Sequence, residues 1–243
     1  PKRNQFLMGR EIDGYRHLYV HDRATGKQVA QLTKGEWEVT DLLAVDEASG
    51  RAWYQSTEAS PLERQVYSVP LNGGAPPTRL TKEKGTHTVS ISPNGEYWTD
   101  TFSSLTEPSR TTLRNAGGYE IAVLRAPDRK ALDEYEILPT ELLTFKGSDG
   151  TLFHARIIRP ANFSPSKKYP AIVSVYGGPH AQTVRDSFAG LSFDQVLAHR
   201  GYVVWQMDNR GSAGRGHLWE AKVSRNFGKQ ELADQVEGVK HLI

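Results

Sequence analysis

Cysteine is absent from the 243 residues of this chain, so disulfides, thiolate chemistry and cysteine-ligated metals are excluded together. No apolar run approaches the ~20 residues of a membrane-spanning helix, and the first residues lack a hydrophobic signal core. Lysine and arginine total 30 against 28 acidic residues, without a dense basic block. Neither nucleic acid nor an anionic membrane is therefore the expected partner. The compartment is unknown: for a soluble chain of this kind, bacterial periplasm and cytoplasm both stay open.

The first half of the sequence repeats. Up to about residue 125, short alternating segments are separated by turn clusters such as Asn72-Gly73-Gly74. Tyr19 and Tyr67 occupy matching positions 48 residues apart, and Leu-Thr pairs recur at the same interval. Four strands in each ~40 to 50 residues are typical of β-propeller blades. The predicted strands lie near 17–22, 27–33, 39–46, 51–57, 65–71, 78–81, 87–93 and 96–104, and a third copy begins at Thr111 and Tyr119.

This repeat is too short for a closed propeller. A propeller needs at least about four blades, and two blades and a fraction are present. The sequence also begins at Pro1 without an initiator methionine. We therefore expect the remaining blades upstream of Pro1. The alternative is a plain antiparallel sandwich in which the matching landmarks are coincidental, but several landmarks in step favour the repeat.

The pattern changes near residues 126–130, from strands alone to strands alternating with helices. Such alternation predicts a parallel sheet with right-handed crossovers. The predicted elements are a hairpin of 141–146 and 152–159, a strand of 171–176, a helix marked by Phe193, Val196 and Leu197, a strand of 202–207, and a final amphipathic helix marked by Leu232, Val236, Val239 and Leu242/Ile243.

The stretch Lys168 to His180 carries the candidate site. Its β-branched run ends in Tyr176, and Gly177, Gly178 and Pro179 follow as a turn. In open parallel sheets the working groups lie just beyond the carboxyl ends of strands, and in α/β-hydrolases the loop after the third strand supplies an oxyanion donor. Tyr176 is therefore a candidate functional residue. The alternative is a strand-end tyrosine whose hydroxyl simply reaches water.

Five segments, taken in order, give a family resemblance: Asp13 to Tyr19, Lys168 to Pro179, His199 to Val204, Asp208 to Gly216 and Gly228 to Gln235. With them, the chain resembles the prolyl oligopeptidase family of serine peptidases, and most of all its dipeptidyl peptidase IV branch. The resemblance implies an incomplete all-β part, residues 1–126, made of the C-terminal blades of a β-propeller. It also implies that residues 127–243 form the N-terminal half of an α/β-hydrolase domain.

The same resemblance implies an exopeptidase. It would remove N-terminal dipeptides of the Pro or Ala type from peptides by acyl transfer, inside a cavity that the propeller caps, with no cofactor and no metal. Tyr176 would donate a hydrogen bond to the oxyanion, a contact worth ~3 to 4 kcal/mol of barrier, and Gly177, Gly178 and Pro179 would shape its turn. Peptides would be the partners. The oligomeric state is not readable, and a homodimer of the intact protein is one hypothesis.

The catalytic triad of such an enzyme is absent from these residues. No Gly-x-Ser-x-Gly elbow occurs; Gly211 to Gly214 comes nearest but has the wrong spacing. We assign none of His180, His199, His217 and His241 to a triad. In the family's strand order, the strand after the final helix would lie beside the 171–176 strand, and without that later strand this apolar strand is left unpaired at a sheet edge. We therefore predict that residues 1–243 alone neither fold cooperatively nor cleave peptides.

Three other functions stay open. The intact protein could be an oligopeptidase or acylaminoacyl peptidase of the same superfamily. It could also be a non-catalytic homologue that binds partners, because catalytic serines can be lost while folds persist. A nucleotide site at Gly211 to Gly216 is a weaker alternative, since the segment follows a strand but lacks the G-x-G-x-x-G spacing and the P-loop Gly-Lys-Ser/Thr.

Overall fold

A computed structural model describes residues 4–243 of the chain, which form two compact units. Unit 1 contains the chain up to Ser104, with Ser109–Ala126 and Gly214–Leu218; unit 2 contains Leu105–Pro108, Pro127–Ala213 and Trp219–Ile243. The first three residues of the predicted all-β part lie outside the described residues. In the part of the chain that the structure covers, no helix combines the length and the hydropathy that crossing a bilayer requires.

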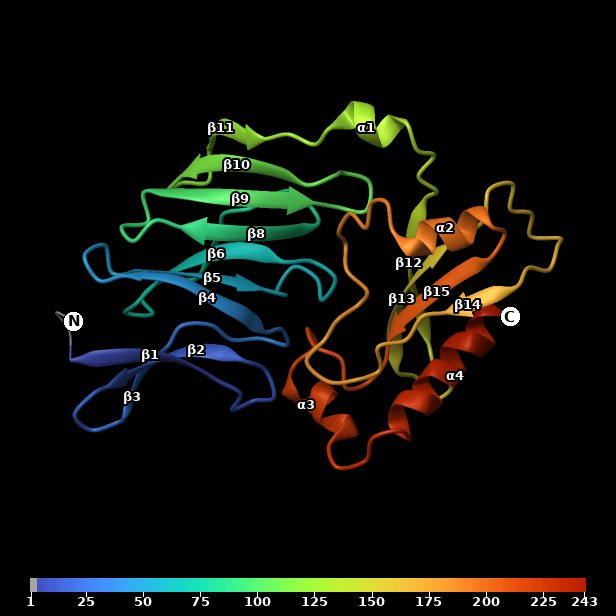
Figure 1. Cartoon of the computed structure of the whole chain (residues 1–243). Coiled ribbons are helices and arrows are strands. Elements are labelled where there is room, and N and C mark those ends of the chain that lie inside the picture. The colour runs from blue at the N-terminus through green and yellow to red at the C-terminus, as the bar shows by residue number, and fades with distance from the viewer. Residues whose placement is uncertain (1–3) are drawn as a thin grey trace. The chain divides into compact units, whose positions relative to one another are not determined.

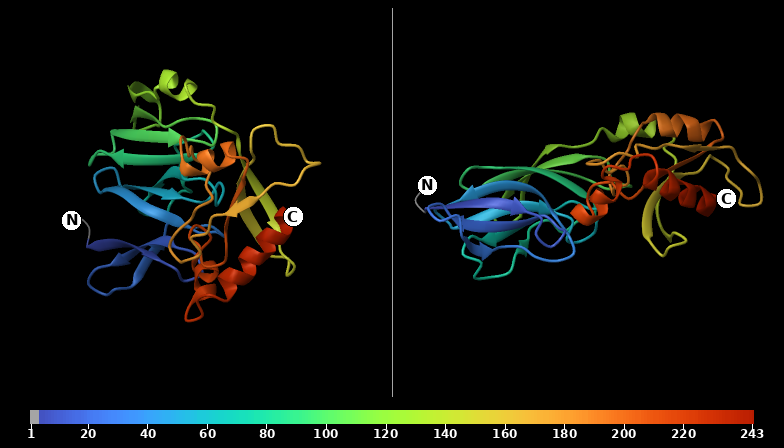
Figure 2. Two further views of the ribbon diagram at one scale, coloured as in Figure 1. Left: turned by 45° about the vertical axis from the view of Figure 1, so that its right-hand side comes forward. Right: turned by 90° about the horizontal axis from the view of Figure 1, so that it is seen from below.

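Unit 1 consists of antiparallel sheets that follow one another along the chain (Figure 1; Figure 2). The first sheet contains β1 (Gln5–Arg10), β2 (His17–Asp22) and β3 (Gln28–Gln31). The second contains β4 (Val39–Asp46), β5 (Arg51–Ser56), β6 (Gln65–Pro70) and β7 (Thr78–Arg79). The third contains β8 (Thr86–Ile91), β9 (Tyr97–Ser103), β10 (Arg110–Asn115) and β11 (Glu120–Arg125).

The eight predicted strands are all present in unit 1, and the described residues before Ala126 contain no helix, as predicted. The grouping differs from the repeat, because the four-stranded sheets begin at β4 and β8 rather than at β2. The repeat interval fixes the period of a blade but not its first strand. Strand β1 was not predicted, since its alternation is short and lies before the first landmark.

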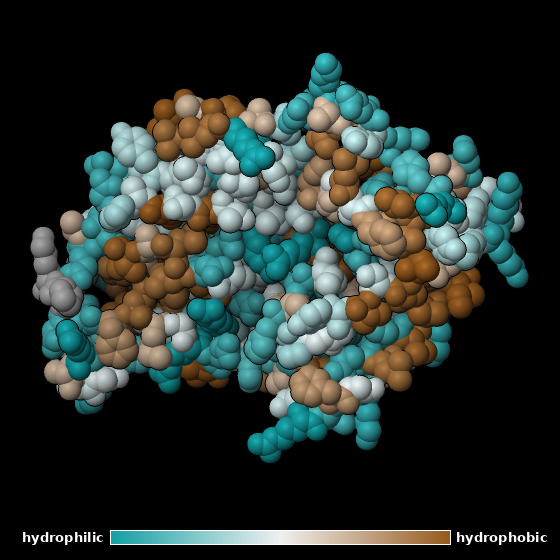
Figure 3. Space-filling view, in the orientation of Figure 1, coloured by the Kyte–Doolittle hydropathy of each residue, from teal (hydrophilic) through white to brown (hydrophobic). Residues whose placement is uncertain are grey.

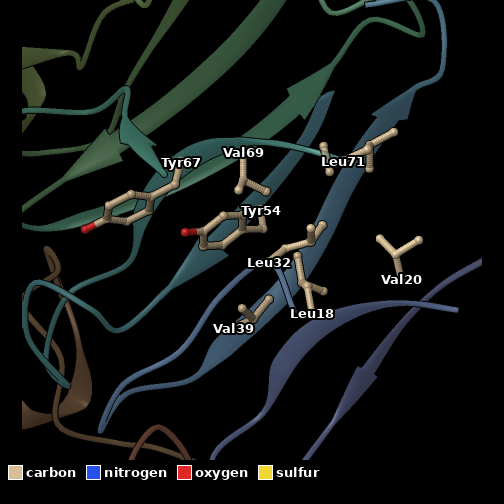
Figure 4. Close-up of a cluster of buried hydrophobic side chains, with 9 residues drawn as sticks. Leu18, Val20, Leu32, Val39, Tyr54, Tyr67, Val69 and Leu71 are labelled. Atoms are coloured by element: carbon tan, nitrogen blue, oxygen red, sulfur yellow. The ribbon is translucent and has the colours of Figure 1, made fainter. Parts of the chain in front are cut away.

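Aromatic and aliphatic side chains join the first two sheets of unit 1 (Figure 4). Tyr54 of β5 and Tyr67 of β6 stack with ring centroids 5.5 Å apart, beside Leu18, Leu32 and Val69. Sheet faces that are apolar in this way must be buried against a neighbour, and burial of one such side chain contributes about 1.5 to 3 kcal/mol. Hydrophobic packing therefore fixes the succession of these sheets.

The third sheet buries charge instead. Asp100 of β9 is fully buried, its Oδ1 lies 3.0 Å from Nδ1 of His87, and its Oδ2 lies 3.0 Å from Nε of Arg114. At the edge of the same sheet, apolar side chains of β11 are exposed, among them Leu124 by 55%. Tyr119, directly before this strand, is 72% exposed. Figure 3 shows hydrophobic residues gathered there. This sheet therefore combines a buried ion-pair cluster with an exposed apolar edge.

Unit 2 is built on one mixed sheet of order β12-β13-β15-β14. Its elements are α1 (Arg129–Asp133), β12 (Thr140–Lys146), β13 (Leu152–Ile158), β14 (Ala171–Val173), α2 (Phe193–His199), β15 (Val203–Asp208), the short helices α3 (His217–Glu220) and η1 (Ala221–Val223), and α4 (Gln230–Leu242). The predicted hairpin, both predicted helices and the parallel pairing of β14 with β15 are confirmed. Helices α1, α3 and η1 are too short to leave a periodic signal.

Alternation along β13 and β15 gives the sheet of unit 2 two buried faces. One face presents Ile158 and Val204 to Ala198 of α2. The other presents Trp205 and Met207, against which α4 packs through Leu242 and Gly238. Strand β15 is consequently buried at every residue, as its apolar sequence predicts for a central strand of a layered α/β unit.

Helix α4 packs with its polar side inward. Leu232 is 63% exposed and Val236 43%, whereas Asp234, Gln235 and Gly238 are buried. The inward side chains meet hydrogen-bonding groups at the end of β15, and Gly238 lets the helix approach so closely that a Cβ there would lie 2.1 Å from Sδ of Met207. The predicted helix is present, but Leu232 and Val236 of the apolar stripe that predicts it lie on its exposed side, whereas Leu242 packs inward.

Strand β14 is shorter than predicted. It ends at Val173, and only the Ser174 N–H, which donates to the Trp205 carbonyl at 2.9 Å, extends the pairing. The prediction that the strand runs to Tyr176 is therefore wrong. Among the described residues β14 lies at the sheet edge and pairs with β15 alone, and the chain leaves β15 after Ser174, two residues before the tyrosine. The predicted edge position is confirmed.

Candidate active site

Tyr176 stands three residues beyond the carboxyl end of β14, with its side chain turned to solvent. It is 64% exposed, and its hydroxyl has no hydrogen-bond partner within residues 4–243. The Tyr176 ring lies against Gly178, where an added Cβ would come within 3.1 Å of the ring carbon Cε1. The phenol is therefore an unused donor whose direction depends on the turn beneath it.

The turn itself has an unusual backbone. Gly177 has φ of 77° and His180 has φ of 60°, a left-handed value that side-chain-bearing residues rarely adopt. Glu220 holds His180 in this state, because its Oε1 accepts from the His180 N–H at 2.9 Å and lies 3.0 Å from Nδ1 of the imidazole. Non-glycine residues persist in such conformations only where neighbouring contacts enforce them, and they gather at functional sites.

The far end of the same loop is tied to Asp208, the last residue of β15. The Asp208 carboxylate accepts from the Thr183 N–H and hydroxyl at 2.8 and 2.7 Å and from the Val184 N–H at 2.9 Å. Burial raises the pKa of Asp208, and the hydrogen bonds from Thr183 and Val184 act in the opposite direction. A buried carboxylate with three donors is a rigid anchor for a loop.

Asn209 follows Asp208 and reaches the near end of the loop. It is 2% exposed, and its Nδ2 donates to the Gly177 carbonyl at 3.2 Å and to the Arg210 carbonyl at 2.7 Å. Its Oδ1 accepts from Nε2 of Gln235 at 3.0 Å. Helix α4 thereby supports the residue that contacts the turn.

Arg210 completes this polar end of β15. Its guanidinium contacts Asp234, a fully buried carboxylate of α4, and donates to Asp149 at 2.8 Å. The hydrogen bond that Arg210 donates to Asp234 raises the pKa of Arg210. Hydrogen bonds from Thr151, followed by that from Arg210, lower the pKa of Asp149 to about 2. These contacts hold the β15 end against α4 and the β12–β13 turn.

The four histidines left unassigned each have a structural contact. His180 pairs with Glu220, His199 contacts the Glu136 carbonyl, and His241 stacks on Phe145 with ring centroids 4.4 Å apart. His217 lies in unit 1 and pairs with Glu11. No three histidine, aspartate or glutamate side chains of residues 4–243 are arranged to hold a metal ion.

A pocket of about 410 Å³ lies elsewhere in unit 2. Apolar groups such as Leu132, Tyr135 and Phe188 line it, together with Arg129 and Asp133. Tyr176 and the turn after it do not. Such apolar hollows are common ligand sites, but this one brings no nucleophile or general base to the tyrosine.

The four predicted residues lie together as a solvent-facing phenol on a bent turn, and a phenol so placed can donate to an oxygen that gains negative charge. Sequence reasoning missed Asp208, Asn209 and Gln235 as the supports of this turn. A signal was present, because polar residues directly follow the buried strand β15, at the same sheet edge as the end of β14.

Comparison with known proteins defines the class first. Residues 1–109 match the family described as "Dipeptidyl peptidase IV (DPP IV) N-terminal region", and residues 191–243 match the "Prolyl oligopeptidase family". The crystal structure of Porphyromonas gingivalis dipeptidyl peptidase 4 superposes with a TM-score of 0.91 at 33% identity, over 98% of this chain and 34% of that one. Propeller blades followed by the start of an α/β-hydrolase are thereby confirmed as the fold.

Curated relatives of this chain are named dipeptidyl peptidases. Dipeptidyl peptidase 8 of Homo sapiens is 29% identical over 98% of this chain, and dipeptidyl peptidase 4 of Trichophyton equinum is 30% identical over 96%. The chain spans about a third of the length of these relatives, 30% and 31%. The predicted resemblance to the prolyl oligopeptidase family is confirmed, and the relatives named here are dipeptidyl peptidases.

Proposed function

We propose that the protein containing this chain is a serine peptidase that releases N-terminal dipeptides of the Pro or Ala type by acyl transfer, with Tyr176 as an oxyanion donor. The observation that carries the proposal is the exposed phenol without a partner among the described residues, held beyond a strand end by a left-handed glycine turn. Membership of a family whose named relatives are dipeptidyl peptidases supports the substrate class. Gly177, Gly178 and Pro179 shape the turn.

Replacing Tyr176 by phenylalanine in the full-length protein tests the role of the hydroxyl. Ala-Pro and Gly-Pro p-nitroanilides report kcat and KM for dipeptide release. The oxyanion contact exists only in the transition state, so we expect kcat to fall by at least about tenfold with little change in KM. The fold should persist, because the ring keeps its contact with Gly178.

Tyr135→Phe is the matched control, since Tyr135 is a comparably exposed tyrosine of the same unit, at 55%. It should leave kcat unchanged. Unaltered turnover in Tyr176→Phe would contradict the oxyanion role. N-acetylated peptides and long peptides without a free N-terminus are assayed alongside: preferred cleavage of either would replace the dipeptidase assignment by acylaminoacyl peptidase or oligopeptidase. Absence of all hydrolysis by the full-length protein would favour a non-catalytic binding homologue.

Three further parts of the proposal concern the whole protein. Residues 1–126 and 127–243 would be parts of two domains, and limited proteolysis near Ala126 would test that boundary. Residues 1–243 expressed alone would neither unfold cooperatively nor cleave peptides, because no Gly-x-Ser-x-Gly elbow is among them; a sharp thermal transition with peptidase activity would contradict this. The intact protein would be a homodimer, which sedimentation of the full-length protein tests.

A further inference from the structure

The turn that carries Tyr176 depends on side chains for its shape. Pro179 has no N–H to donate, and the left-handed values at Gly177 and His180 remove the chain from regular pairing. Two side chains bind its backbone instead: Glu220 accepts from the His180 N–H, and Asn209 donates to the Gly177 carbonyl. The second contact is made to the residue directly after Tyr176.

Asn209 is itself held in one orientation. Gln235 uses a single amide nitrogen, Nε2, to donate to both the Met207 carbonyl at 3.2 Å and Oδ1 of Asn209 at 3.0 Å. Because Oδ1 of Asn209 is thus occupied as an acceptor, its NH2 group must face the Gly177 carbonyl. Both amides are nearly buried, at 2% and 7% exposed, so water offers little competition.

We infer that Asn209 is a positioning residue of the peptidase, which fixes the Gly177 carbonyl and through it the direction of the Tyr176 hydroxyl. This inference rests on the proposed function and deepens it. The phenol has no hydrogen bond of its own among the described residues, so its placement follows the turn backbone. A donor displaced by about an ångström loses much of its effect on a transition state.

A double-mutant cycle in the full-length enzyme tests the inference. Asn209→Ala is introduced into the wild type and into Tyr176→Phe, and kcat and KM are measured with Ala-Pro p-nitroanilide. If Asn209 acts through the Tyr176 hydroxyl, Asn209→Ala lowers the wild-type kcat by about tenfold with KM within about twofold. In Tyr176→Phe, where no hydroxyl is left to position, the same change should alter kcat by less than about twofold.

Asn209→Asp keeps the size of the side chain but presents only acceptors to the Gly177 carbonyl. It should lower kcat at least as much as Asn209→Ala, and it serves in the cycle if the alanine variant does not fold. Ser212→Ala is the matched control: Ser212 is buried in the same segment and accepts from Nε1 of Trp219 at 3.1 Å. Loosening the segment there should lower the melting temperature and leave kcat unchanged.

Two results overturn the inference alone. In one, Tyr176→Phe loses activity while Asn209→Ala and Asn209→Asp keep the wild-type kcat. In the other, Asn209→Ala lowers kcat equally in both backgrounds, so that it supports the fold and not the phenol. A wild-type kcat in Tyr176→Phe is a separate outcome, because it overturns the proposed oxyanion role and the inference with it.

Discussion

The two parallel strands of unit 2 end in opposite ways. Strand β14 makes three pairs with one neighbour and leads into a turn whose tyrosine is 64% exposed. Strand β15 is buried at every residue and ends in side chains that bind the loop and α4. The end of β14 thus carries an exposed phenol, and the end of β15 carries buried side chains that bind the loop after that phenol. In the proposed site, the oxyanion donor and its supporting groups would come from neighbouring strands.

Loss of the Arg210 charge at the end of β15 should destabilise unit 2 the most. Arg210→Ala leaves Asp234, which is fully buried, without its cation. Breaking a buried pair by removing one partner costs about 3 to 5 kcal/mol. We expect the free energy of unfolding of unit 2, measured by urea denaturation of the full-length protein, to fall by about 3 kcal/mol. Arg210→Lys should restore part of it, and an unfolding midpoint equal to that of the wild type would contradict the buried pair.

The contact of α4 with β15 should be the next most sensitive. At Gly238 an added methyl group would collide with Sδ of Met207, 2.1 Å away. Alanine favours a helix over glycine by about 1 kcal/mol, but overpacking costs about 1 to 3 kcal/mol. Gly238→Ala should therefore destabilise unit 2 by about 1 kcal/mol, as judged by its melting temperature. In a Met207→Ala background the sign should reverse, since the helical preference then acts without the collision.

At the end of β14, a single methyl group can separate stability from activity. Gly177 has φ of 77° and Gly201, after α2, has φ of 92°. Alanine in the left-handed region costs about 1 to 2 kcal/mol. Gly177→Ala and Gly201→Ala should lower the melting temperature of the full-length protein by similar amounts. Only Gly177→Ala should lower kcat, because Gly201 lies before the amino end of β15, whereas the turn follows the carboxyl end of the parallel strand β14. Equal kcat losses would contradict this distinction.

The smallest effect concerns pH. The pKa of Asp149 falls from 3.8 to about 2 in the folded chain through hydrogen bonds from Thr151 and Arg210. A lowered folded pKa means that the carboxylate stabilises the fold above pH 3.8, and that this contribution is lost as pH falls toward 2. Asp149→Asn should lower the melting temperature slightly at pH 6 and by progressively less at pH 4 and pH 3. A difference that grows on acidification would contradict the assignment.

Sequence reasoning predicts the elements well where periodicity decides them. The strands of unit 1, the β12–β13 hairpin and α4 all follow from alternation, turn residues or helical spacing. It fails where tertiary contacts decide. Leu232 and Val236 predict the wrong inward side of α4, because the buried acceptors at the end of β15 outweigh the apolar stripe. The repeat interval gives the length of one blade, but it does not show which strand is the first of each four-stranded sheet.

The candidate site shows the same division. Tyr176 and its glycine turn can be found from the sequence because a β-branched run ends in them. The contacts of Asn209 cannot be predicted from the sequence, because its partners Gly177 and Gln235 are 32 and 26 residues away. Only the parallel pairing of β14 with β15 brings them together. Local pattern therefore identifies the candidate tyrosine, and topology identifies the side chains that hold its turn.

The single-sided pairing of β14 has a consequence for amide hydrogen exchange. The Ser174 N–H points to β15, where it is bonded to the Trp205 carbonyl. Successive residues of a strand direct their N–H groups to opposite edges, so the Val173 amide points to the open side. While β14 is an edge strand, deuterium uptake should be slow at the Ser174 amide and fast at the Val173 amide. A slow Val173 amide in the full-length protein would report that another strand covers this edge.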